Sequence, residues 1–149
     1  MREAFTHTLR QTLERAQQEA RDHKQEFVGT DHLFLSVIEC EDCEAERVLR
    51  MQHLSPMQLR SVIMHDLPTA TDAPVISGDL PLSPKAQRVI NSAIVKAQTL
   101  REPKISTRFL LLSLLDDAHT LIRSAVSDAG GDVNQLRQAL VESPMDFEE

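Results

Sequence analysis

The sequence contains one pair of cysteines at a spacing that can hold a metal ion or a redox disulfide. Cys40-Glu-Asp-Cys43 has the C-x-x-C pattern, but a tetrahedral metal needs two further ligands, and the chain has only these two cysteines. A redox role is typical of this motif at the head of a helix in a thioredoxin-like α/β fold. Without either context, we interpret both residues as free thiols in a loop between two helices. We expect no metal and no cofactor.

The remaining residues that could perform chemistry form no catalytic pattern. The six histidines are scattered, and neither H-E-x-x-H nor G-x-S-x-G occurs. His32 is expected to pack against a neighbouring helix start. The four glycines do not form the G-x-x-x-x-G-K-[ST] loop that holds nucleotide phosphates. We therefore predict that this chain is not an enzyme and does not bind ATP.

Two charged residues, Asp31 and Arg108, each directly follow a threonine that can cap a helix. A carboxylate in the first turn is favoured by about 0.3–1 kcal/mol, so Asp31 could serve the helix alone. A cation there opposes the helix dipole, so Arg108 needs compensation. It could reach Asp116 or Asp117 of its own half, or a carboxylate across an interface. Alternatively, it offers an anion site beside the helix start, for a phosphate or an acidic tail.

Both threonines belong to an internal repeat. Thr30-Asp-His-Leu-Phe-Leu-Ser36 aligns without a gap with Thr107-Arg-Phe-Leu-Leu-Leu-Ser113, at an offset of 107 − 30 = 77 residues. The same offset pairs Ala16 with Ala93 and Ala20 with Ala97. Since chance matches do not keep one register over such a length, the chain is read as two copies of one structural unit.

Each copy reads as four helices. Thr6 and Ser83, the latter followed by Pro84, can cap long amphipathic helices, and Thr30 and Thr107 can cap central helices that are apolar nearly all round. Short amphipathic helices are expected around residues 45–51, 57–64, 121–129 and 133–141.

The predicted fold class is all-α, with two tandem four-helix repeats packed as a pseudo-twofold, eight-helix single domain over residues 1–149. Scarce aromatic residues and few Gly and Pro favour helices over a turn-rich β protein. We place repeat one at 4–66, a linker at 67–80, repeat two at 81–142 and a tail at 143–149. Neither repeat has enough surface to bury its central helix alone, so the two should pack together.

The formal net charge of −7 at pH 7 argues against binding to nucleic acid or to an anionic membrane, which both need a basic surface. The longest apolar run, Phe109–Leu115, is far shorter than the roughly 20 residues that cross a bilayer. The first residues lack the apolar core of a secretory signal. We expect a cytoplasmic protein.

Several motifs resemble the N-terminal domains of the Clp family of ATP-driven protein unfoldases. Phe5-Thr6 and Ala16-Gln-Gln-Glu-Ala20 are similar to the opening of these domains, and Phe27-Val-Gly-Thr-Asp-His-Leu-Phe-Leu35 resembles their G-T-E-H-[IL]-L-L pattern. Leu82-Ser-Pro-Lys-Ala86 looks like the start of the family's second repeat. The resemblance extends from about Ala4 to about Val141.

The resemblance implies a non-catalytic module that docks adaptor proteins or protein substrates for a Clp-type unfoldase or protease. Its partners would be these proteins and the Clp ATPase or peptidase subunits. The alternative is a free-standing accessory subunit that stabilises a Clp protease assembly without binding substrate, like relatives in plastids, which would place the chain in the plastid stroma. Binding could use the region of Thr6 and Asp31 or the groove between the repeats.

The resemblance also implies candidate ligand residues. ClpC-type domains bind phosphoarginine with a threonine from the first helix start and the glutamate of G-T-E-H, positions that Thr6 and Asp31 occupy here. A carboxylate can pair with the guanidinium, while a hydroxyl and helix-start amides receive the phosphoryl group. The corresponding positions of the second repeat are Ser83 and Arg108. Because a cation cannot pair with a guanidinium, we expect that second site to be lost in its usual form and to remain, at most, as an anion site.

Overall fold

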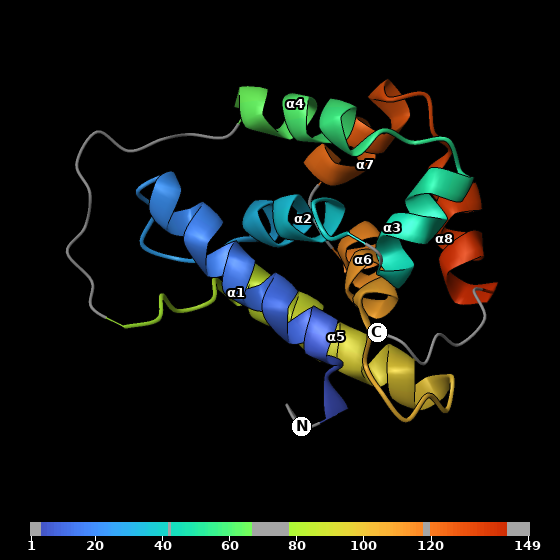
Figure 1. Ribbon diagram of the computed structural model, residues 1–149, viewed down its shortest axis with the longest axis horizontal. Coiled ribbons are helices and arrows are strands. Elements are labelled where there is room, and N and C mark those ends of the chain that lie inside the picture. Colours follow the sequence, from blue (N-terminus) through green and yellow to red (C-terminus); the bar gives the residue numbers. More distant parts are fainter. Residues whose placement is uncertain (1–3, 42, 67–77, 118–119, 143–149) are drawn as a thin grey trace.

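The computed structural model describes residues 4–41, 43–66, 78–117 and 120–142, and within these ranges the chain forms eight helices and no strand. The first four are α1 (His7–Asp22), α2 (Thr30–Ile38), α3 (Glu44–Met51) and α4 (Pro56–Asp66). The second four are α5 (Pro84–Thr99), α6 (Thr107–Asp117), α7 (Thr120–Asp128) and α8 (Val133–Glu142) (Figure 1). The all-α prediction is confirmed. Most of the predicted linker, residues 67–77, and the predicted tail, 143–149, lie outside the described residues.

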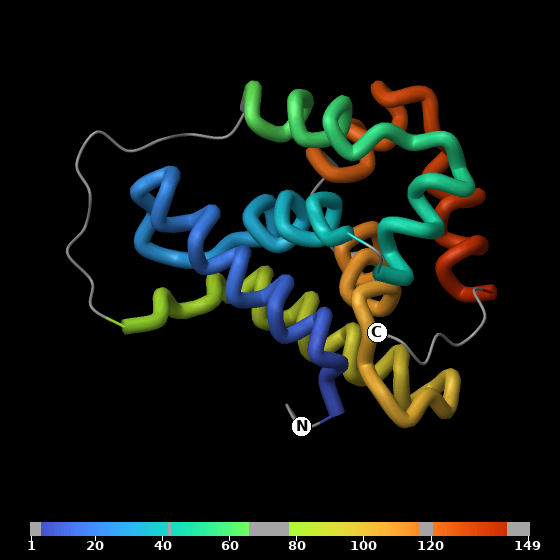
Figure 2. Tube along the Cα trace, in the orientation of Figure 1, coloured from blue at the N-terminus to red at the C-terminus, as the bar shows by residue number. Residues whose placement is uncertain are grey.

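The helices pack with the reciprocity of a pseudo-twofold pair. α1 packs on α2 as α5 packs on α6, and α3 of the first repeat packs on α8 as α7 of the second packs on α4. The α4–α7 pair lies along one side of the molecule, and the central helices α2 and α6 contact each other (Figures 1 and 2). Two tandem four-helix repeats therefore form one eight-helix arrangement, as the repeat predicts. The exact repeat boundaries stay a prediction.

The core centres on these two middle helices. In α2 every residue from His32 to Ile38 is buried, and in α6 every residue from Thr107 to Leu115 is buried. A helix without an exposed face can only lie inside a bundle, so the remaining helices surround this pair. None of the helices within the described residues is long and apolar enough to span a membrane.

Two short backbone bridges hold the repeats together. Phe5 pairs with Ile105, and Val28 pairs with Leu82, each as an isolated parallel bridge. The 77-residue offset converts one pair into the other, since 5 + 77 = 82 and 28 + 77 = 105. Each repeat therefore contributes the segment before its first helix to the segment before the second helix of the other repeat.

The capping predictions for the two long helices are confirmed. The Thr6 hydroxyl accepts a hydrogen bond from the Leu9 backbone N–H at 3.0 Å, and the Ser83 hydroxyl accepts one from the Ala86 N–H at 3.1 Å. Pro84, which lacks an N–H, stands at the first position of α5, where that group would have no helical partner.

The capping predictions for the central helices are wrong in detail. The residue that caps α2 is Gly29, and Thr30 is already helical. Thr107 is likewise the first residue of α6, and its hydroxyl accepts a hydrogen bond from the Ala45 N–H at 3.2 Å. Ala45 lies in the first turn of α3, whose own cap residue, Cys43, provides no side-chain hydrogen bond. Thr107 therefore caps a helix of the opposite repeat.

Candidate binding site

The structure pairs the predicted ligand residues across the repeats. Thr6 donates its backbone N–H to the carbonyl of Ile105 at 3.0 Å, just before α6. Ser83 donates its backbone N–H to the carbonyl of Val28 at 2.9 Å, three residues before Asp31. The start of α1 thus lies beside the start of α6, and the start of α5 beside the start of α2. The segment that leads into Asp31 is thus hydrogen-bonded to Ser83, and Thr6 is hydrogen-bonded to the segment that leads into Arg108.

The carboxylate of Asp31 folds back over the start of α2. Its Oδ1 atom accepts a hydrogen bond from the His32 N–H at 2.9 Å, and 29% of the side chain is exposed. A Cβ atom on Gly29 would lie only 2.6 Å from that oxygen, so the absence of a side chain at Gly29 permits this position. Asp31 therefore serves the helix start and still offers part of its carboxylate to solvent.

His32 completes the same helix start from inside. Its Nδ1 atom accepts a hydrogen bond from the Gly29 N–H at 2.9 Å, and the His23 ring lies 6.2 Å away, centroid to centroid. Burial lowers the pKa of His32 from its ordinary value, an effect that the Asp31 carboxylate only partly offsets. The neutral ring that results carries its proton on Nε2, a buried atom without a hydrogen-bond partner in the described residues.

Arg108 is buried and does not form an open anion site. Its side chain is 3% exposed, with Nε 3.3 Å from Glu44 Oε2 and Nη2 2.9 Å from Glu102 Oε1. Nη1 donates to the carbonyl of Leu140 at 2.8 Å, and the guanidinium carbon lies 4.4 Å from the centroid of the Phe109 ring. The expectation of a carboxylate across the interface is confirmed by Glu44. The expected anion site at Arg108 is not present in open form, because these partners already engage the buried guanidinium.

The two acids of the second repeat that were expected to pair with Arg108 are Asp116 and Asp117. Neither is shown to contact it. Asp116 accepts hydrogen bonds from the Arg137 guanidinium, with an Nη2–Oδ2 distance of 3.0 Å, and lies 3.6 Å from Lys96 Nζ. The side chain of Asp117 is not among those described. Glu44, the partner across the interface, also accepts a 2.5 Å hydrogen bond from the Ser106 hydroxyl. This buried cluster joins α3 of one repeat to the start of α6 in the other.

The two cysteines are buried between α2 and α3. Cys43 caps α3 without a side-chain hydrogen bond to it, and its thiol donates to the Cys40 carbonyl with a 3.7 Å sulfur–oxygen distance. Hydrogen bonding with Cys40 and, second, burial raise the pKa of the Cys43 thiol well above its usual range. A buried thiol that resists ionisation is a poor nucleophile. Among the described side chains, no group of three or more His, Cys, Asp or Glu is arranged to hold a metal ion.

A groove of about 380 Å³ runs between the repeats, a size within the usual range of ligand sites. We call it the inter-repeat groove. Its apolar wall comprises Phe5, Leu13, Val28, Leu33, Leu80, Leu82 and Ile90, and its rim carries Arg10, Glu14, Asp79, Gln17 and Gln87, with Pro81 beside them. The side chain of Gln17 holds one edge in place, because it donates to the Leu80 carbonyl and accepts from the Leu80 N–H. The sequence suggested a groove between repeats but not its lining.

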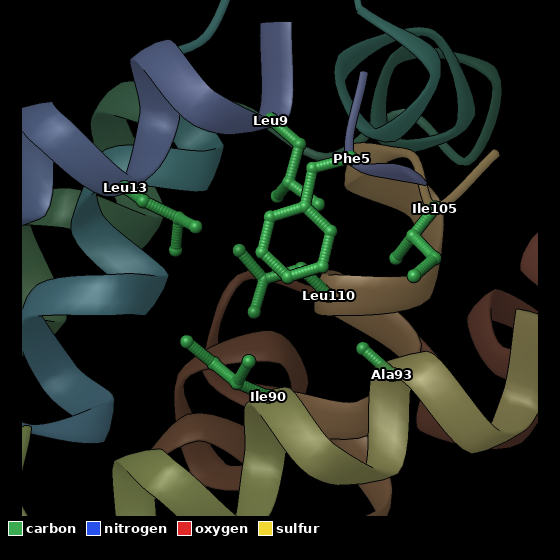
Figure 3. Close-up of a pocket in the computed structure, with 7 residues that line it drawn as sticks. All are labelled: Phe5, Leu9, Leu13, Ile90, Ala93, Ile105 and Leu110. Atoms are coloured by element: carbon green, nitrogen blue, oxygen red, sulfur yellow. The ribbon is translucent and has the colours of Figure 1, made fainter. Parts of the chain in front are cut away.

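A second apolar space lies at the neighbouring bridge and is almost filled. Figure 3 shows the Phe5 ring pointing between Leu9, Ile105 and Leu110. The volume left there is about 10 Å³, room for no more than about one water molecule.

Comparison with known proteins identifies the family. The family model described as the Clp repeat (R) N-terminal domain matches residues 4–107 and 81–146, so the chain belongs to this family. Among curated relatives, the chloroplastic chaperone protein ClpC1 of Oryza sativa subsp. japonica is 26% identical over 141 residues. That match covers 95% of this chain but 15% of the relative, so this chain corresponds to a small part of such a protein.

Solved structures share the fold. The N-terminal domain of the chaperone ClpD from Arabidopsis thaliana superposes with a TM-score of 0.75 at 19% identity, covering 93% of each chain. A ClpV N-domain solved in complex with a VipB peptide superposes with a TM-score of 0.73 at 14% identity, covering 93% of this chain and 86% of that one. The predicted family and fold are confirmed.

Proposed function

We propose that this chain is a non-catalytic protein-binding module that docks adaptor proteins or protein substrates for a Clp-type, ATP-dependent unfoldase. The observation that carries the proposal is the inter-repeat groove, a hollow of about 380 Å³ with an apolar wall and a polar rim. Grooves of this kind accept apolar side chains of a partner, while rim groups select its orientation.

The family supports the same function. A ClpV N-domain of the same fold has been solved with a peptide bound, so the fold can serve peptide recognition. The 149 residues contain no nucleotide-binding loop, so the energy for unfolding has to come from an ATPase elsewhere in the same or another chain. We expect the protein to be located in the cytoplasm, or in the plastid stroma if the chain belongs to a plastid Clp system.

Binding of a permanently unfolded, fluorescently labelled protein such as casein tests the docking function. We expect saturable binding by fluorescence anisotropy, and Ile90→Ser in the groove wall should weaken it. Val95→Ser is the matched control, since Val95 lies on the same helix, is 57% exposed and does not line the groove. Circular dichroism verifies that both variants fold. Equal binding by the two variants would show that the groove does not bind the unfolded protein.

A second candidate function is recognition of phosphoarginine at the neighbouring helix starts that carry Asp31 and Ser83. The partly exposed Asp31 carboxylate can pair with a guanidinium, and the Ser83 hydroxyl stands at the start of α5, whose amides favour a phosphoryl group. Thr6, the other predicted ligand residue, is bonded through its backbone to Ile105, three residues before Arg108, which stands at the position of the carboxylate in the second repeat. We therefore propose one phosphoarginine site per chain, built from both repeats.

The accessory-subunit alternative makes a different prediction. A subunit that only stabilises a Clp protease assembly should co-purify with peptidase subunits in the absence of any ATPase. It should also bind neither unfolded protein nor phosphoarginine.

A further inference from the structure

Leu82 is one residue that distinguishes the open inter-repeat groove from its filled counterpart. The 77-residue offset makes Leu82 the equivalent of Phe5, since 5 + 77 = 82. Phe5 is 4% exposed and its ring occupies the apolar space beside Ile105, leaving about 10 Å³ (Figure 3). Leu82 is only partly buried, and the space that it borders measures about 380 Å³.

Two other equivalent positions are also smaller on the side of the open groove, since Leu9 of the filled space corresponds to Ala86 and Ile105 corresponds to Val28. Leu33 in the open groove corresponds to Leu110 in the filled space. Position 82 is the one of these at which an aliphatic side chain stands in place of an aromatic ring, and Leu82 itself lines the open groove. In the filled space, the Phe5 ring points between Leu9, Ile105 and Leu110 (Figure 3).

The rim of the groove is more acidic than basic. Its charged residues are Glu14, Asp79 and Arg10, and all three are exposed. Neither acid forms an ion pair with another residue of the described chain. With a formal net charge of −7 on the whole chain, the groove attracts a cationic partner and repels an anionic one.

From this wall and this rim we infer the chemistry of the occupant, an inference that rests on the proposed docking function. The groove receives a protein segment that places one aliphatic side chain beside Leu82 and an adjacent Lys or Arg against Glu14 and Asp79. The shape of residue 82 sets the size of the apolar side chain, and the two acids set the charge of its neighbour.

Labelled Gly-Ser peptides that differ only in their central residues test the charge preference. One carries Leu-Leu-Arg-Arg, a second Leu-Leu-Glu-Glu, and a third Ser-Ser-Arg-Arg. We expect the first to bind more tightly than the second by about three- to tenfold at low salt, with the difference shrinking as salt is added. The third should bind poorly, because it has no side chain for the apolar wall. The double variant E14K/D79K should reverse the preference between the first two.

Substitutions at position 82 test the shape. Leu82→Phe should weaken binding of the Leu-Leu-Arg-Arg peptide by about tenfold or more, because the ring fills the hollow as Phe5 does in the other space. Leu100→Phe is the control, since Leu100 is 40% exposed and does not line the groove. Leu82→Ala should shift the preference toward a peptide with Phe in place of Leu, a result that a misfolded variant could not give.

The outcomes separate this inference from the function on which it rests. Binding by the wild type without a preference for basic peptides, or unchanged in Leu82→Phe, overturns the inference and leaves the docking function standing. Failure of the wild type to bind any peptide or unfolded protein overturns both.

Discussion

The guanidinium Nε of Arg108 lies 3.3 Å from the Oε2 atom of Glu44 in the opposite repeat, and both side chains are less than 5% exposed. Removing one member of such a pair leaves the other charge buried without compensation, which costs about 3–5 kcal/mol. We expect Arg108→Ala to lower the free energy of unfolding by this amount, measured by urea denaturation. Arg137→Ala, which removes the 48% exposed partner of Asp116, should cost less than about 1 kcal/mol.

The same contact makes a charge reversal at Arg108 unfavourable. Arg108 is equivalent to Asp31 of the first repeat. By that comparison alone, Arg108→Glu would supply the missing carboxylate and restore a second phosphoarginine site. The structure argues against this result, because the new carboxylate would lie among Glu44 and Glu102 in the interior. The variant should be more destabilised than Arg108→Ala. A folded Arg108→Glu protein with two ligand sites would contradict this account of the cluster.

Thr107 should contribute to stability through a helix that it does not belong to. Because its hydroxyl accepts from the Ala45 N–H, Thr107→Val should cost about 1 kcal/mol of unfolding free energy, typical of a lost cap. Thr107→Ser keeps the hydroxyl and should recover most of the cost. Thr99→Val is a control at an exposed helix end, and urea denaturation compares the three. Equal stabilities of the Val and Ser variants at position 107 would rule out the capping role.

Phosphoarginine binding should depend on residues from both repeats. In calorimetric titrations we expect one site per chain, with Asp31→Ala and Ser83→Ala each abolishing detectable binding. Loss of one partner from a shielded charge pair costs about 2–5 kcal/mol, enough to remove a weak signal. Thr6→Ala should reduce stability by about 1 kcal/mol through its lost cap and leave binding unchanged. The reverse result, with Thr6 required and Ser83 dispensable, would contradict the pairing across repeats.

The stability of the chain should fall as the pH drops through the histidine range. Burial lowers the pKa of His32 in the folded protein, whereas the unfolded chain titrates near about 6.5. Below that pH the unfolded state binds a proton that the folded state resists, so unfolding becomes more favourable until the folded pKa is reached. Glu19, His23 and Asp31 also act on this ring.

His32→Asn isolates the contribution of His32. Its side-chain oxygen can accept from the Gly29 N–H as Nδ1 does, and it does not titrate. Between about pH 7.5 and pH 5, urea denaturation should show a steeper loss of stability in the wild type than in this variant. Parallel curves would mean that another group causes the pH dependence.

The sequence was most informative where a local signal decides the structure. Helix periodicity and the caps at Thr6 and Ser83 were predicted correctly, because a cap acts within three residues of itself. The repeat register predicted the pseudo-twofold fold for a similar reason, since equivalent apolar patterns bury equivalent faces.

Contacts between the repeats could not be predicted from either repeat alone. Nothing near Thr107 indicates that its hydroxyl caps α3, and nothing near Arg108 names Glu44 as its partner. The assignment of Thr6 and Asp31 to one site assumed that residues of one repeat meet each other, and it stays a prediction. The backbone bonds to Ile105 and Val28 show that each helix start meets the opposite repeat.

The reciprocal bridges, Phe5 to Ile105 and Leu82 to Val28, describe an isologous interface within a single polypeptide. Two separate copies of one ancestral repeat could form both bridges by the same rule, each lending its leading segment to the other. The chain thus has the geometry of a homodimer whose two copies exchange their leading segments, here joined in one polypeptide. Once the copies were joined, each could vary without its twin, so one Phe–Leu difference and one Asp–Arg difference could give equivalent surfaces different roles.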